Sequence, residues 1–171
     1  MASLSTWQTR VLLLIGWLPC AVGSADAETI IDVVGFRDVL SEIAVNHAVE
    51  GASRRLARPS CGLILSDFED RPGRTLSMRL QGQRMSLAEH IAAIRFVDAS
   101  TSSLCRTAAI AFTKAGSYTI EICALDFKRL FDRERRRAEF VIIHELLHSL
   151  GLGENPPTDR VIDRQIAVRC R

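Results

Sequence analysis

The chain has no internal repeats, no low-complexity linker and no Cys-x-x-Cys pair. Without repeats or linkers, 171 residues are enough for one domain with a core and too few for two. The lack of closely spaced cysteines argues against a zinc ion held by cysteines. The composition, 47% hydrophobic and 25% charged, is typical of a globular protein and argues against disorder.

The N-terminal residues 1–27 have the order of a secretory signal peptide. Arg10 precedes an apolar run from Val11 to Leu18, and a small-residue stretch ends in Ala25-Asp26-Ala27. The run is too short to span a bilayer, and no later segment is apolar enough to do so. We therefore predict a signal removed at 1–27, a mature domain at 28–171 without a membrane anchor, and a secreted or periplasmic location. An apolar N-terminal helix packed on the domain is the alternative.

Four cysteines follow this segment: Cys61, Cys105, Cys123 and Cys170. An even number of cysteines in an exported chain predicts disulfides, and four cysteines allow three pairings. We favour Cys105–Cys123, which closes a local stretch, and Cys61–Cys170, which ties the C-terminus to the body of the domain. Four reduced, buried thiols are the alternative.

The order of helical and strand patterns predicts an α+β domain. Apolar spacing indicates a helix within 36–58, and an apolar run between Pro59 and an acidic cluster indicates a strand at 61–68. Ser86 can cap a short helix to 94, a strand follows at 95–99, and runs at 107–113 and 118–124 flank a hairpin turn. A long helix is predicted from 134 to 150, followed by Gly151 and Gly153 as stop signals, and Thr158 can cap a last helix to about 168.

Residues 144–148 read His-Glu-Leu-Leu-His, within an apolar helix. Histidines four apart lie on one helix face, so His144 and His148 can bind the same ion, and zinc is the metal expected there. Glu145 lies on the flank of that face, where it can act as general base on a zinc-bound water without being a ligand. Buried polar groups without partners are costly, so three on one turn need a common reason such as a metal. A chance match, with both histidines in core hydrogen bonds, is the alternative.

Glu154 lies six residues after His148, with Gly151 halfway, and so is the first candidate for a third ligand. Asp159 and Asp163 are the other candidates, and a solvated loop carboxylate is the alternative role for Glu154. Gly151 can take the left-handed conformation that turns the chain back under a metal.

At this motif the sequence resembles the zincin superfamily and, more closely, small exported bacterial metallopeptidase-like proteins. The resemblance is strongest over 138–157, where Gly-Leu-Gly-Glu-Asn-Pro-Pro follows the apolar helix. It implies a zincin-like fold, with a short mixed sheet and its lower edge strand over a buried active-site helix. Metzincins usually have His or Asp at the position of Glu154 and a Met-turn after the motif, whereas no Met follows Met85.

The remaining polar features of the sequence are weaker indicators of function. The basic run from Lys128 to Arg137 is interpreted as a solvated helix face, and without interleaved aromatic residues it does not indicate nucleic-acid binding. His47 and His90 lie apart and have no ligand spacing. Tyr118, the one tyrosine, has no spacing that indicates an oxyanion role.

Together these features predict an exported zinc metallopeptidase that hydrolyses peptide bonds in a peptide or protein substrate. The substrate is expected to lie extended along an edge strand above the helix. The alternative is a secreted binding or structural domain that keeps the zinc for stability. An open fourth coordination position favours the enzyme and a closed one the structural site. The oligomeric state is not indicated.

Overall fold

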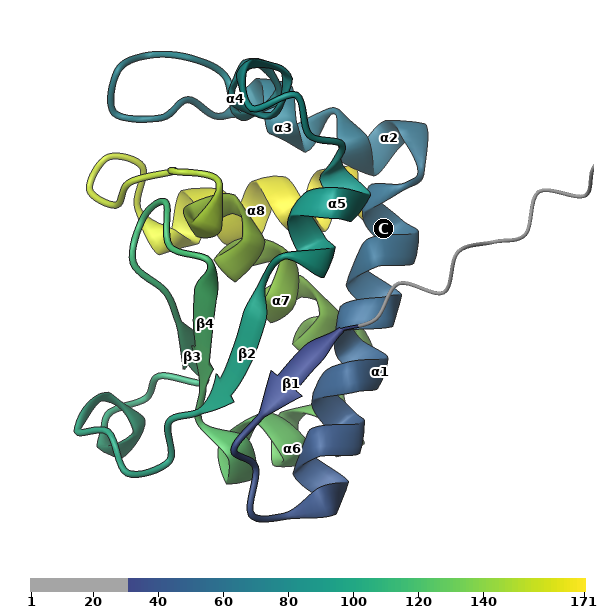
Figure 1. Cartoon of the computed structure of the whole chain (residues 1–171), viewed down its shortest axis with the longest axis vertical. Helices are drawn as coiled ribbons and strands as arrows, with labels where there is room; N and C mark the ends of the chain where they lie inside the picture. The colour runs from purple at the N-terminus through teal and green to yellow at the C-terminus, as the bar shows by residue number, and fades with distance from the viewer. Residues whose placement is uncertain (1–30) are drawn as a thin grey trace, which may run out of the picture.

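The computed structural model describes residues 31–171, so the signal peptide predicted at 1–27 lies outside the described residues. In chain order the elements are β1 (Asp32–Val34), α1 (Val39–Leu56), α2 (Pro59–Gly62), α3 (Ile64–Asp67), α4 (Leu76–Gly82), α5 (Leu87–Ala92), β2 (Arg95–Asp98), η1 (Leu104–Arg106), β3 (Ala111–Phe112), β4 (Thr119–Ile122), α6 (Ala124–Arg133), α7 (Arg135–Ser149) and α8 (Asp159–Arg169). Figure 1 shows the sheet beside the long helix α1. Within residues 31–171, no helix is both long and apolar enough to cross a membrane.

The strands form one short mixed sheet in the order β1-β2-β4-β3. β2 is parallel to both β1 and β4, while β3 runs antiparallel to β4 and forms one edge. Side chains alternate across the sheet: Phe96, Ile120 and Ile122 are buried, whereas Arg95 is exposed. One face of the sheet therefore belongs to the core. The predicted α+β class is confirmed.

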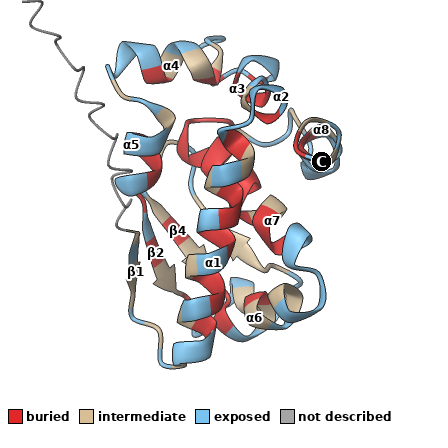
Figure 2. Cartoon of the chain, turned by 90° about the vertical axis from the view of Figure 1, so that its right-hand side faces the viewer, coloured by how far each residue is buried: buried red, intermediate tan, exposed pale blue. Residues whose placement is uncertain are grey.

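Helices α1, α6 and α7 lie together on one side of the sheet (Figure 2). α1 begins after Asp38, whose carboxylate accepts the backbone N–H groups of Leu40 and Ser41. Its buried stripe consists of small or branched residues that allow close helix packing: Val45, Ala48, Val49 and Ala52. The helices predicted within 36–58 and at 134–150 are confirmed as α1 and α7, with slightly different ends.

The strand predicted at 61–68 is wrong, because this segment forms the helices α2 and α3. Pro59 occupies the first position of α2, where proline fits a helix. Ile64, Leu65 and Phe68 are buried in the core, and their spacing fits one face of a helical turn as well as a short strand. A short apolar run does not distinguish the two, so tertiary packing decides the outcome.

The predicted short helix, second strand and hairpin are present within narrower limits. Ser86 and Glu89 form a capping box at the start of α5. The strand predicted at 95–99 is β2, at Arg95–Asp98. The hairpin pairs β3 with β4, and both strands are shorter than predicted: β3 is limited to Ala111–Phe112, and β4 ends at Ile122, shortly before α6 begins at Ala124. The helix predicted after Thr158 is α8, although the Thr158 side chain makes no capping hydrogen bond.

Two disulfides join Cys61 to Cys170 and Cys105 to Cys123, so the favoured pairing is confirmed. The first links α2 to the end of α8 across 109 residues, and the second links η1 to the end of β4 across 18 residues. Restricting the unfolded chain over loops of these lengths is worth about 4.7 and 3 kcal/mol in the chain-entropy treatment. The long-range disulfide therefore contributes the larger stabilisation of the two.

Candidate metal centre

The motif lies on α7, which is buried from Ile142 to Ser149. His144, Glu145 and His148 are exposed by 9%, 6% and 3%, so three polar side chains are enclosed on one turn of the buried part of α7. Histidines four residues apart share a helix face, as the sequence predicted. Their Nε2 atoms are 3.0 Å apart.

The hydrogen bond made by Nδ1, the outer ring nitrogen, determines which tautomer each histidine adopts. His148 Nδ1 is 2.9 Å from the carbonyl oxygen of Leu152, which can only accept, so this nitrogen carries the proton. His144 Nδ1 is 2.8 Å from an Asp163 carboxylate oxygen, which also accepts. In the neutral rings both Nε2 atoms therefore hold lone pairs, and these face each other. Burial lowers the pKa of His148, which favours its neutral form.

The carboxylate of Glu154 completes the cluster. Its Oε1 lies 3.3 Å from His148 Nε2, and the ligand atoms of His144, His148 and Glu154 all lie within 4.8 Å of one another. A tetrahedral zinc with bonds of about 2.0–2.1 Å holds its ligand atoms about 3.3 Å apart. Three acceptors converge here without a donor among them. Imidazole nitrogens and carboxylate oxygens are ligands that zinc takes, and two of the three separations, 3.0 and 3.3 Å, are close to this value.

The turn after α7 brings Glu154 back to the helix. Gly151 has a φ of +101°, so the left-handed conformation predicted for it is present. A Cβ at this position would lie 2.9 Å from Nη1 of Arg79, whose guanidinium packs beneath the turn. Leu152 pairs as an isolated bridge with Asp70, a buried carboxylate 3.6 Å from Arg79 Nη1. The loop before α4 therefore supports the turn.

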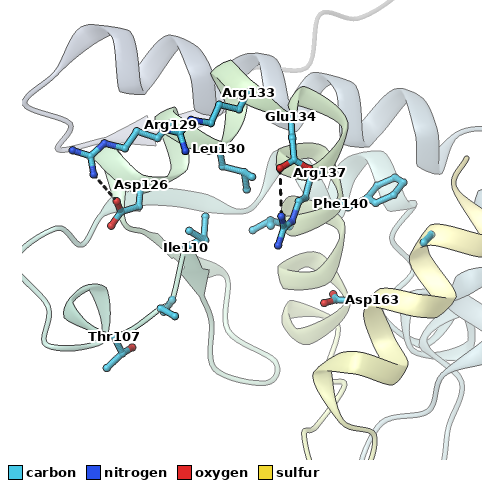
Figure 3. A pocket seen from close by; sticks show the side chains of 14 residues that line it. Thr107, Ile110, Asp126, Arg129, Leu130, Arg133, Glu134, Arg137, Phe140 and Asp163 are labelled. Atoms are coloured by element: carbon cyan, nitrogen blue, oxygen red, sulfur yellow. Dashed lines mark hydrogen bonds and ion pairs between the residues drawn. The ribbon is translucent and has the colours of Figure 1, made fainter.

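The other two candidate ligands take different positions. Asp163 projects from α8 toward α7 (Figure 3), and its contact is with the outer nitrogen of His144, away from the ligand cluster. Such a carboxylate orients a ligating histidine and raises its basicity. Asp159 is outside the three-residue cluster and acts on Glu145 through its charge. Glu154 is therefore the best placed of the three candidates.

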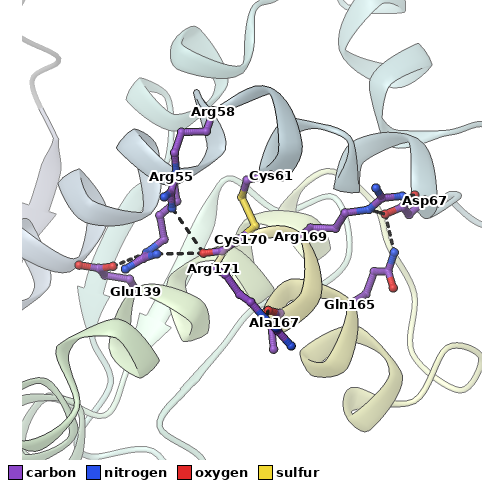
Figure 4. The surroundings of a disulfide bond; sticks show 10 residues. All are labelled: Arg55, Arg58, Cys61, Asp67, Glu139, Gln165, Ala167, Arg169, Cys170 and Arg171. Carbon is purple, nitrogen blue, oxygen red and sulfur yellow. Dashed lines mark hydrogen bonds and ion pairs between the residues drawn. A yellow bond between two sulfur atoms is a disulfide. The ribbon is translucent and has the colours of Figure 1, made fainter.

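Helix α8, which carries Asp163, is held from its C-terminal end (Figure 4). Cys170 is bonded to Cys61, and its carbonyl oxygen accepts hydrogen bonds from Arg55 and Arg58. Asp67 adds two further contacts with α8: it accepts hydrogen bonds from Gln165 and from the guanidinium of Arg169. Segments distant in sequence thus fix the position of the carboxylate beside His144.

Glu145 is buried beside the two histidines and faces the edge of the sheet. Burial, together with the charges of Glu154 and Asp159, raises its pKa to about 8, although the backbone of Thr113 opposes this. Its Oε2 has no hydrogen-bond partner among the residues that the structure describes. In the absence of a cation this raised pKa favours the protonated form, in which the buried group carries no uncompensated charge. It lies next to the ligand cluster without belonging to it.

The remaining histidines and the tyrosine lie outside the cluster. His90 is buried, with Nε2 2.9 Å from the hydroxyl of Ser149, and the ring of Tyr118 packs against it at 5.2 Å. His47 is on the exposed side of α1 beside Glu50. Sequence analysis missed the supporting roles of Asp163 and Arg79, and no motif could have revealed them because both depend on contacts between distant segments.

The comparisons with known proteins are negative: no protein-family model, no curated protein and no solved structure matches this chain.

Proposed function

We propose that the chain is an exported, zinc-dependent peptidase of the zincin type, with His144, His148 and Glu154 as ligands and Glu145 as general base. One observation carries the proposal. The lone pairs of two largely enclosed histidine nitrogens converge with a half-exposed carboxylate, and the Nδ1 atoms of both histidines are already committed as donors. Such an arrangement is repulsive unless a cation lies between the three groups.

The residues of the chain have distinct roles in this proposal. Bound zinc would supply a Lewis acid that polarises a carbonyl and acidifies water at its open coordination position. Glu145 accepts the proton of the attacking water and delivers it to the leaving amine nitrogen. Burial and the nearby carboxylates raise its pKa to about 8, and the positive charge of a bound zinc would favour the ionised form that accepts a proton.

The edge strand β3 supports a peptide as the substrate. β3 bonds to β4 on one side, and its other side ends the sheet. Thr113 follows β3 directly and its backbone lies against Glu145. An extended peptide added to this edge would therefore carry its amide bonds past the cluster, held by main-chain hydrogen bonds.

Export is supported by the two disulfides, because such bonds persist in oxidising compartments. They are compatible with a secreted or periplasmic protein.

The competing candidate is a secreted binding domain whose zinc is structural. The same three side chains could also form a closed, structural zinc site if Glu145 turned onto the metal as a fourth ligand. The two candidates differ in what Glu145 does. In the peptidase it moves a proton, and in the structural site it holds the metal or orients a histidine.

The test is the substitution Glu145→Gln in the mature chain, with His148→Ala as the metal-binding control. Wild type and Glu145→Gln should each hold about one zinc, and His148→Ala close to none. Cleavage of a broad peptide library should fall about 10²–10⁴-fold in Glu145→Gln, because an amide cannot accept the proton. The melting temperature should hold or rise, since a buried ionisable group is replaced by a neutral one.

Equal zinc in wild type and His148→Ala would remove the metal assignment. Unchanged cleavage in Glu145→Gln would show that another group is the base. No cleavage by zinc-loaded wild type, together with a lower melting temperature in Glu145→Gln, would favour the structural site.

A further inference from the structure

A groove of about 1080 Å³ lies along the N-terminal half of α7 (Figure 3), and Asp163, the hydrogen-bond partner of His144, is among its lining residues. It lies between residues 107–110, which lead into β3, the junction of α6 and α7, and one side of α8. Its apolar lining comes from Ile110, Leu130, Phe140 and Val141. The volume is slightly above the usual range for ligand pockets, roughly 300–1,000 Å³.

The groove and the metal centre share one face of α7. Arg137 and Val141 line the groove, and His144 and His148 continue the same face at helical spacing. From His144 back to Arg137 the helix rises about 10 Å, which corresponds to about three residues of an extended chain. A peptide passing the cluster along β3 would therefore enter the groove within about three residues.

The pairing direction defines which part of a peptide enters. Glu145 lies against Thr113 at the C-terminal end of β3, whereas the groove begins at residues 107–110 before β3. Antiparallel pairing is the more stable geometry for a strand added at an edge. A peptide in that direction has the residues on the C-terminal side of the cleaved bond in the groove.

Three guanidinium groups line the far part of the groove: Arg129, Arg133 and Arg137. Two have local partners, because Arg129 bonds to Asp126 at 3.1 Å and Arg137 to Glu134 at 3.4 Å. These pairs are exposed and i,i+3, a class worth little in stability, so either arginine can exchange its partner for a ligand. Arg133 forms no ion pair with any residue from 31 to 171. The third lining carboxylate, Asp163, is engaged with His144.

We propose that this groove selects a carboxylate on the C-terminal side of the cleaved bond, bound by Arg133 and Arg137 with help from Arg129. The inference rests on the proposed peptidase function for the position of the cleaved bond. An apolar side chain occupies the part lined by Ile110 and Val141, and the carboxylate follows two residues later, since alternate side chains of an extended peptide point the same way. The carboxylate belongs to an acidic side chain or to the C-terminus of a short substrate.

The test measures binding, so that it does not depend on turnover. The protein used is the zinc-loaded Glu145→Gln variant. The first pair of probes are fluorescein-labelled decapeptides made of alanine and glycine around a single leucine. Two residues after the leucine, one probe carries glutamate and the other glutamine. A second pair of probes ends at that position with glutamine, as the free acid or the amide. Affinities are measured by fluorescence anisotropy at low and high salt.

The glutamate probe should bind about five- to tenfold more tightly than the glutamine probe at low salt, a size typical of partly exposed charge pairs, and the ratio should shrink at high salt. A larger ratio for free acid over amide would identify the terminal carboxylate as the ligand. Adding Arg133→Gln and Arg137→Gln should bring both ratios close to one. Arg136→Gln, an exposed arginine of α7 that does not line the groove, is the matched control and should keep them.

The proposal would be overturned if both affinity ratios were near one in the Glu145→Gln protein, or if no probe bound. It would also be overturned if the ratios survived the double substitution of Arg133 and Arg137. Circular dichroism of the double variant checks that the fold is retained. The outcome is separate from that of the proposed function. Selective binding without any cleavage by wild type would support the groove and refute the peptidase, whereas cleavage with no carboxylate preference would refute the groove alone.

Discussion

Removal of the Asp163 carboxylate should weaken zinc binding without removing a ligand. The carboxylate is 2.8 Å from His144 Nδ1 and lies on α8, 19 residues after the histidine. In Asp163→Ala the ring loses the acceptor that holds its tautomer and its orientation. Loss of such an outer partner typically weakens metal affinity 10–100-fold.

The expected loss of zinc affinity is at the lower end of this range, about tenfold. The Asp163 side chain is 68% exposed, so water can replace part of its hydrogen bond to His144. A tenfold weaker affinity reduces the stabilisation by saturating zinc by about 1.4 kcal/mol. The metal-free protein should be little changed, since alanine is favourable at an exposed position in the middle of a helix. The substitution therefore separates metal affinity from folding.

The assay is competition for zinc against a chelating dye at neutral pH, together with melting curves with and without zinc. Asp163→Asn keeps an oxygen that can accept from His144, so it should lose less affinity than Asp163→Ala. Asp159→Asn removes a nearby charge that makes no contact with His144 and is the matched control. Glu154→Ala, as loss of a ligand, should weaken binding more than any of these.

Wild-type zinc affinity in Asp163→Ala would refute the proposed role of Asp163 in orienting His144. It would also be refuted if Asp159→Asn weakened zinc binding as much, because the effect would then be one of charge at a distance. A larger loss in Asp163→Ala than in Glu154→Ala would mean that Asp163 is the third ligand.

Three further predictions concern the frame around the site. The double substitution Cys61→Ser with Cys170→Ser should lower the free energy of unfolding by about 2–5 kcal/mol, measured by denaturant titration. It should also weaken zinc binding in the dye assay, because α8 loses its covalent bond to α2. Unchanged zinc affinity would show that this disulfide does not support the metal centre. Burial lowers the pKa of His90 to about 4, below its unfolded value of about 6.5. Between these two pH values the unfolded chain binds more protons than the folded one. The free energy of unfolding should therefore fall as the pH drops from 6.5 to 4, by at most about 3 kcal/mol. His90→Gln should remove that part of the pH dependence in metal-free protein, and identical pH profiles would show that His90 does not titrate as described. Gly151→Ala should lower both stability and zinc affinity, because a Cβ at a φ of +101° would meet the Arg79 guanidinium at 2.9 Å; a wild-type melting temperature would refute this.

Local signals in the sequence were sufficient for the elements with long or chemically distinct patterns. The helix with His144 and His148 could be predicted because its apolar run is long and its stop signals are strong. The capping box at Ser86 and the turn before Tyr118 are likewise local features, which short-range hydrogen bonds determine.

Other elements depended on their surroundings. The run from 61 to 68 has a composition that suits a strand, and it became helical because Ile64 and Phe68 reach the core from one side of a turn. β1, at Asp32–Val34, was not predicted, since three residues carry no periodic signal and gain their structure from pairing with β2.

The same division holds for the candidate site. The spacing of His144, Glu145 and His148 was sufficient by itself to predict a metal-binding helix face, because four residues make about one helical turn. Which of Glu154, Asp159 and Asp163 lies near both histidines depends on the tertiary structure: a left-handed turn brings Glu154 to them, and α8, held by a disulfide, places Asp163 beside Nδ1 of His144. Groups that meet through the folding of distant segments have no fixed spacing along the chain, so no local pattern could have assigned them.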